Sequence, residues 1–173
     1  SPLSALSHLD GRYHQQLAPL TAYCSEAALI RYRVRVEIEW LIALAQDPGL
    51  AEIRPFSATA VGELRQAAAA FAEADAARVK EIESRTNHDV KAIEYWLKER
   101  FAAHAEVAAA AEFIHFACTS EDINNLAHAL MLGDARAKVM LPALDEIIGK
   151  LGALAHELAD APMLARTPGQ AAT

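Results

Sequence analysis

The stretch SEAALIRYRVRVEIEWLIALAQ, residues 25–46, decides the fold class. Its middle, residues 31–40, alternates charged and apolar side chains, and this period of two is typical of a strand. Helical spacing is satisfied as well, because the flanks are rich in alanine and leucine and opposite charges stand four residues apart. These charges form the pairs Arg33/Glu37 and Arg35/Glu39. A lone strand here would have no obvious partner, so we interpret the stretch as a helix with two intrahelical ion pairs.

Helical segments separated by loops also account for the rest of the chain. The first residues form an irregular arm that ends in Arg12-Tyr13, and Asp47-Pro48-Gly49 ends the first helix. We expect further helices over 57–71, with a longer alternative that continues to Val79, over 89–102, over 123–139, and from about Pro142 onward. No other segment has a strand pattern, so the sequence predicts an all-α protein.

Apolar side chains form a seam in the last predicted helix. They follow one another in steps of four and three, the spacing of helices packed in a bundle: Leu144, Ile148, Leu151, Ala155 and Leu158. We therefore expect two domains, an N-terminal helical domain over 1–111 and the beginning of a helical bundle over 112–173. Because the chain stops soon after the seam without a terminating pattern, we expect it to be truncated.

Composition and charge exclude several classes of protein. Apolar residues make up 53% of the chain. The net charge is −7, and the sequence contains no block of like charges. A nucleic acid or an anionic membrane is therefore not expected as the main partner. Cys24 and Cys118 have no CxxC spacing and no secretory leader before them, which indicates a reducing cytoplasm. No apolar run reaches about 18 residues, so no membrane span is expected.

A dense polar cluster occupies residues 115–125. It combines two hydroxyls, two acids, two amides and the imidazole of His115, and it directly follows an apolar run. Polar groups in such a place are expected to be half-buried, where they must be hydrogen-bonded or bind a ligand. The pattern Thr119-x-x-Asp122 also fits a helix capping box with Asp in place of Glu. A binding site and a simple helix cap both remain open for this cluster.

A second polar cluster occupies residues 84–91. Thr86-x-x-Asp89 again fits a helix cap. Asn87, His88 and Asp89 nevertheless place an amide, an imidazole and a carboxylate in a row at a helix N-terminus, where free N–H groups favour anions. We favour a functional role for His88, because its neighbours are able to fix its tautomer.

Four motifs, in this order, resemble the fumarase/aspartase superfamily and, within it, the bacterial adenylosuccinate lyases. The motifs cover essentially the whole chain: Asp10–Tyr13, Thr86–Lys91, Glu112–Asn125, and Arg166-Thr167-x-Gly169-Gln170. The resemblance implies a homotetramer of long helices without metal or organic cofactor. It also implies cleavage of a nucleotide, adenylosuccinate, to AMP and fumarate, and cleavage of the related succinylocarboxamide ribotide.

The same resemblance implies substrate-binding roles for eight residues. They are Arg12 and Tyr13 at the nucleotide phosphate, Asn87, His88 and Asp89 along the substrate, and Thr119 and Ser120 at the succinyl carboxylates with Gln170 nearby. His88 is the one residue among them with a supporting catalytic role.

The implied reaction is a β-elimination, in which a base removes a proton beside a carboxylate and an acid protonates the departing nitrogen. In the family the acid is the histidine of Thr-His-Gly-Gln, and the matching position here is Pro168, which has no titratable group. Ala171 also replaces a proline typical of the family. The family's base is a serine in a Ser-Ser-x-Met-Pro-x-Lys-x-Asn loop, and these 173 residues contain no such motif. We therefore expect this chain by itself to be inactive.

Two alternative functions remain. An argininosuccinate lyase would share the Thr-Ser-x-Asp motif, but it does not account for Asn87-His88-Asp89 together with Arg12-Tyr13. A non-catalytic helical interaction module is favoured by Pro168 and by the missing base loop.

Overall fold

The structure is a computed structural model that describes residues 2–162, 165–167 and 170–172. The chain divides into two compact units, Ser1–Ala135 and Arg136–Thr173. The domain boundary expected between residues 111 and 112 stays a prediction.

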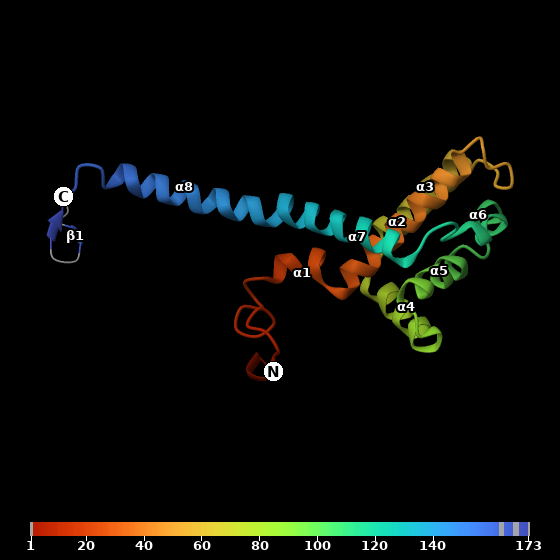
Figure 1. Ribbon diagram of the computed structural model, residues 1–173, viewed down its shortest axis with the longest axis horizontal. Coiled ribbons are helices and arrows are strands. Elements are labelled where there is room, and N and C mark those ends of the chain that lie inside the picture. Colours follow the sequence, from red (N-terminus) through yellow and green to blue (C-terminus); the bar gives the residue numbers. More distant parts are fainter. Residues whose placement is uncertain (1, 163–164, 168–169, 173) are drawn as a thin grey trace. The chain divides into compact units, whose positions relative to one another are not determined.

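The first unit is built from helices and turns (Figure 1). Its elements are the 3₁₀ turn η1 (Pro2–Ser4), α1 (Ala18–Cys24), α2 (Glu26–Gln46), α3 (Ala58–Ala69), α4 (Glu73–Thr86), α5 (Asp89–Arg100), α6 (Ala105–Ala109), the 3₁₀ turn η2 (Ala111–Phe113) and α7 (Ser120–Ala135). The predicted all-α class is confirmed.

The deciding stretch is helical from Glu26 to Gln46, as predicted. Ser25 caps α2, because its Oγ accepts a hydrogen bond from the Ala28 N–H at 3.1 Å. Glu26 adds a negative charge in the first turn, where the helix dipole favours one. The helix propensity of the flanks thus prevails over the strand-like alternation in the middle. The alternation arises because the helix is buried on two sides, not because the segment is a strand.

One predicted helix is too long in its alternative form. The extension as far as Val79 is wrong, because α3 ends at Ala69 and α4 begins at Glu73. The Ala72 N–H donates to the Asp75 carboxylate at 2.9 Å and starts the new helix. Phe71, in the connection, packs edge-on against Trp96 with ring centroids 5.3 Å apart. The break at residues 70–72, which contain no Gly or Pro, is therefore explained by tertiary packing.

The core lies on two sides of α2. On one side α2 packs against α3, α4 and α5 through Ile30, Val34, Ile38, Leu41, Leu64, Val79, Ile93 and Leu97. On another side it packs against α7 and the start of α5 through Tyr32, Val36, Val90, Ile123, Ala127 and Met131. Each large apolar side chain buried in this way contributes about 1.5–3 kcal/mol. Side chains of α2 are consequently placed to reach both the α5 and the α7 N-termini.

The second unit contains a π-helical turn, η3 (Arg136–Met140), then α8 (Leu141–Glu157), β1 (Ala165–Thr167) and β2 (Gln170–Ala172). The predicted helix start near Pro142 is confirmed. The two strands pair antiparallel with Thr167 opposite Gln170, a short ladder that the sequence did not indicate. Pro168 lies outside the described residues. No helix in the described part of the chain is both long and apolar enough to cross a membrane.

Candidate functional site

A single buried arginine joins the two polar clusters. Arg33 is 5% exposed. Its Nη2 lies 2.8 Å from the Asp89 Oδ2 at the start of α5, and its Nε donates to the Asn124 Oδ1 in α7 at 2.8 Å. The clusters at 84–91 and 115–125, which are far apart in the sequence, therefore meet on α2.

The ion pairs expected within α2 are wrong. Arg33 pairs with Asp89, and Glu37 pairs with His115. Glu39 accepts two hydrogen bonds from Arg65, each at 2.8 Å. Arg33, Glu37 and Glu39 thus find their partners on other elements, because α2 is covered by neighbours on more than one side.

His88, not Thr86, caps α5. Thr86 is the last residue of α4, so the predicted Thr86 cap is wrong. The His88 Nδ1 accepts a hydrogen bond from the Lys91 N–H at 3.2 Å, while the Asp89 Oδ1 lies 3.7 Å from the same nitrogen, beyond hydrogen-bond range. An imidazole that accepts at Nδ1 carries its proton on Nε2 when neutral. The cap therefore fixes the tautomer of His88 and leaves a half-exposed Nε2–H donor.

Asn87 makes the turn between α4 and α5. Its φ of 52° is left-handed, a conformation that asparagine adopts more readily than most residues. Its neighbour Asp89 accepts from the Val90 N–H at 2.9 Å with one oxygen and pairs with Arg33 through the other. Desolvation acts to raise the pKa of Asp89, but the Val90 N–H and the Arg33 charge outweigh it, so this pKa lies below its ordinary value. Asp89 is thus a fixed carboxylate.

The N-terminus of α7 combines a cap with a free hydroxyl. The N–H and the hydroxyl of Thr119 both donate to the Asp122 Oδ2, at 2.7 and 2.9 Å. These two bonds lower the pKa of Asp122. The half-buried Ser120 hydroxyl has no hydrogen-bond partner among the described residues. Capping therefore accounts for Thr119 and Asp122 but leaves Ser120 available to a ligand.

The loop before α7 is held by two side chains of α2. His115 and Ala117 have left-handed φ angles of 63° and 59°, which are strained for residues with a Cβ. The His115 Nδ1 lies 2.6 Å from the Glu37 Oε1, and the Trp40 Nε1 donates to the Phe116 carbonyl at 2.8 Å. These contacts stabilise a backbone that would otherwise relax.

Glu37 is fully buried, and its Oε2 has no hydrogen-bond partner in the part of the chain that the structure describes. Desolvation raises the pKa of Glu37 above its ordinary value, although the nearby His115 opposes the shift. Sequence reasoning missed Arg33, Glu37 and Trp40 as site-building residues. The alternation over 31–40 was the pattern that pointed to them, because a helix with charges at every second residue must bury some of them.

Three predicted positions are not joined to these clusters. Arg12 is exposed and Tyr13 is 44% exposed on the arm. No hydrogen bond or ion pair within the described residues links either of them to residues 84–91 or 115–125. Gln170 lies in β2 of the second unit. Their substrate-binding roles stay predictions.

A cavity of about 630 Å³ adjoins the start of α7. Its lining comes from α2 and from the loop and first turns of α7, and includes Trp40, Cys118, Asp122 and Leu126. Burial, followed by the charges of Glu37 and Asp122, raises the pKa of the Cys118 thiol, which keeps it protonated and unreactive. Within the described residues, no group of three or more His, Cys, Asp or Glu side chains could hold a metal ion.

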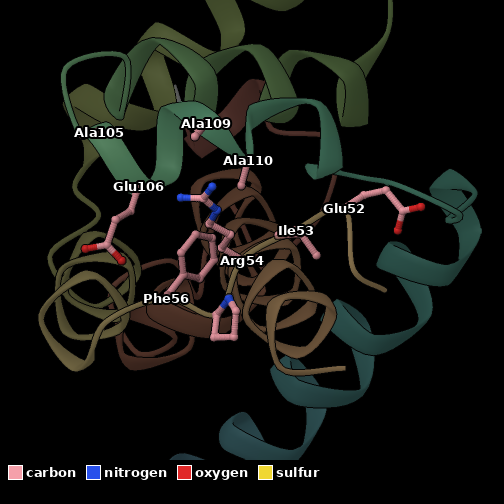
Figure 2. Close-up of a pocket in the computed structure, with 9 residues that line it drawn as sticks. Glu52, Ile53, Arg54, Phe56, Ala105, Glu106, Ala109 and Ala110 are labelled. Carbon is pink, nitrogen blue, oxygen red and sulfur yellow. The ribbon is translucent and has the colours of Figure 1, made fainter. Parts of the chain in front are cut away.

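A second cavity, of about 510 Å³, lies between the loop before α3 and the α6 segment. Figure 2 shows the Arg54 side chain extending beside Phe56 toward Ala109 and Ala110, while Glu106 points to the other side. Glu106 accepts hydrogen bonds from the N–H and the hydroxyl of Ser57, both at 2.7 Å. Within the described residues, none of the predicted substrate-binding residues lines either cavity, and only the first cavity adjoins one of the two polar clusters.

Comparison with known proteins indicates the same family as the four motifs. The chain is 53% identical to the adenylosuccinate lyase of Haemophilus influenzae and 51% identical to that of Escherichia coli, in each case over all of its 173 residues. It is 44% identical over 99% of its length to the adenylosuccinate lyase of Dictyostelium discoideum. The chain spans 38% of the length of the two bacterial relatives and 37% of the third. A model of the lyase family matches residues 11–173, and the chain belongs to this family.

Proposed function

We propose that this chain supplies the substrate-binding clusters of an adenylosuccinate lyase. The reaction is the β-elimination of fumarate from adenylosuccinate, which gives AMP, and from the succinylocarboxamide ribotide. The observation that carries the proposal is the Arg33 bridge, because it brings together the two clusters that the family resemblance selects. The identity to adenylosuccinate lyases over the whole chain supports this substrate class.

Each cluster offers different groups to the substrate. The Ser120 hydroxyl and the free N–H groups at the start of α7 suit a succinyl carboxylate, since a helix N-terminus attracts anions. His88 offers an Nε2–H donor, and Asp89 supplies a fixed acceptor. Arg12 and Tyr13 would bind the phosphate, and Gln170 would complete the succinyl subsite. The two anionic ends of the substrate are then held by different segments.

These 173 residues do not supply the proton-transfer groups of the family. Pro168 occupies the position of the family's acid, and the motif of the base serine is not among these residues. His88 supports the reaction by orienting the substrate. The complete enzyme would be a cytoplasmic homotetramer that requires neither a metal nor an organic cofactor, as the family resemblance implies.

The test is a chimera in which residues 1–173, carrying Pro168→His, are joined to the remainder of the Escherichia coli relative. Ser120→Ala removes a hydrogen bond to a charged group, worth about 1.5–3 kcal/mol, and should lower kcat/KM for adenylosuccinate about ten- to a hundred-fold. Arg12→Ala should mainly weaken inhibition by AMP. Thr21→Ala is the control, because this exposed hydroxyl lies outside both clusters and donates to the Ala18 carbonyl of its own helix.

The proposal fails if Ser120→Ala keeps its full kcat/KM and only lowers Tm while Arg12→Ala leaves AMP inhibition unchanged. Both clusters would then be structural. Cleavage of argininosuccinate in place of adenylosuccinate would favour the alternative lyase.

A further inference from the structure

Arg33 is a charged residue buried in the first unit. Taking a guanidinium out of water is costly unless its donors are paired with good geometry. At Arg33, one donor is paired with the Asp89 carboxylate and another with the Asn124 side-chain oxygen, both at 2.8 Å. The two partners belong to different helices, α5 and α7, so the pairing serves more than the stability of α2 itself.

The surroundings of Arg33 make it a rigid reference point. It lies on the helix whose Ile30, Val34 and Ile38 are almost completely buried. One and two turns further along, Glu37 and Trp40 hold the loop that leads into α7. The planar fork of a guanidinium also fixes the angle between its two partners, which an ammonium does not.

We propose that Arg33 is a positioning residue that sets the N-termini of α5 and α7 in one fixed relation. Under the proposed function, on which its catalytic relevance rests, this keeps the His88 Nε2–H donor and the Ser120 hydroxyl at a constant separation. Arg33 itself touches no substrate. It acts through Asp89 on one side and through Asn124 on the other.

The test uses the 173-residue chain without substrate, by hydrogen exchange followed by mass spectrometry. Arg33→Gln removes the charge and should speed exchange together in peptides covering 88–92 and 119–125, by about tenfold or more, while peptides from the middle of α4 stay unchanged. Arg33→Lys keeps a charge for Asp89 but loses the fork. It should restore protection at 88–92 and leave 119–125 fast.

Two further variants serve as controls. Arg35→Gln carries the same substitution on the exposed side of the same helix and should change neither segment. Asn124→Ala removes only the α7 partner, so it should shift the NMR resonance of the Arg33 Nε–H and speed exchange at 119–125 alone. This variant keeps the inference testable if Arg33→Gln fails to fold.

The inference is overturned if Arg33→Gln speeds exchange equally throughout the first unit, if only one of the two segments responds, or if Arg33→Lys behaves like Arg33→Gln in both. No substrate is present in these measurements. Their failure would therefore leave the Ser120→Ala result in the chimera, and with it the proposed function, unaffected.

Discussion

The two longest helices, α2 and α8, differ in what covers them. Twelve of the 21 residues of α2 are buried, including Arg33 and Glu37, whereas none of the 17 residues of α8 is buried. The sequence of α8 has the cleaner apolar seam, and that of α2 has the more charges. An apolar pattern thus predicts that a helix forms, but not whether a neighbour buries it.

The largest expected difference between the two helices is the loss of stability when a large apolar side chain is shortened, because only a buried side chain leaves a cavity. Ile38 in α2 is 1% exposed, and Ile38→Ala should lower the free energy of unfolding by about 2–4 kcal/mol. Leu151 in α8 is 61% exposed, and Leu151→Ala should change it by less than about 0.5 kcal/mol. Urea unfolding of the monomeric chain, followed by tryptophan fluorescence and circular dichroism, measures both. Equal losses would mean that α8 is buried in solution.

The seam of α8 should drive self-association. Leu144, Ile148, Leu151 and Leu158 are all at least half exposed, and exposed apolar surface of this kind tends to be covered by another chain. Replacing Leu151 with lysine should weaken self-association about tenfold or more, because burying a leucine is worth about 1.5–3 kcal/mol. Analytical ultracentrifugation gives the dissociation constant. Ala153→Lys adds the same charge off the seam and is the control. A wild-type chain that stays monomeric at high concentration, or a Leu151→Lys variant that associates as strongly as the wild type, would contradict the prediction.

The N-termini of α2 and α8 also differ, and we expect this difference to have a smaller effect on stability. The Ser25 hydroxyl caps α2, whereas no side chain caps α8, which begins at Leu141-Pro142. Ser25→Ala should therefore lower the free energy of unfolding by about 1 kcal/mol. Met140→Ala, at the corresponding position of α8, should have no capping effect. Thermal unfolding of both variants decides the matter, and an equal drop in Tm would argue against a specific cap at Ser25.

The buried Glu37 should give the smallest effect, which appears as a pH dependence of the free energy of unfolding. Burial raises its pKa above the ordinary 4.5, so the folded chain binds this proton more tightly than the unfolded chain does. The stabilisation is complete below pH 4.5 and is lost as the pH rises through the raised pKa. Glu37→Gln does not titrate, so its unfolding free energy should not fall in this window. The titratable groups that face Glu37 are His115 on the loop and Glu94 on α5, and Glu94 is itself paired with Lys91 and Lys98.

Urea titrations at pH 4.5, 5.5 and 6.5 measure the difference between wild type and Glu37→Gln. The control is Glu39→Gln, since Arg65 lowers the pKa of Glu39 and gives the opposite sign, with stabilisation that is lost as the pH falls. Parallel pH dependences for wild type and Glu37→Gln would show that burial does not control this carboxyl.

Local sequence patterns predicted the helices of the chain better than they predicted the contacts between them. The helix over 25–46 and the start of α8 followed from composition and spacing. The break between α3 and α4 did not, because it depends on Phe71 packing against Trp96 and not on a Gly or Pro. The cap of α5 was assigned two residues too early, since Asn87 follows α4 in a left-handed conformation and His88 takes the cap position.

The candidate site was only partly predictable. The polar clusters were visible as dense runs of polar residues, but the residues that hold them were not. Arg33 and Asn124 are 91 residues apart, and Glu37 and His115 are 78 apart, so spacing within a helix suggested nearer partners that the structure does not use. Contacts between distant segments depend on packing that no local pattern encodes.

Fumarate release from adenylosuccinate is the most direct test of the central claim that this chain carries the binding clusters but not the proton-transfer groups. The 173-residue chain, with or without Pro168→His, should release fumarate only at background rate. In the chimera with the remainder of the Escherichia coli relative, Pro168→His should raise the rate about 10²–10⁴-fold over the same chimera with Pro168, the usual contribution of a general acid. Fumarate release by the chain alone, or equal rates for the two chimeras, would contradict the account.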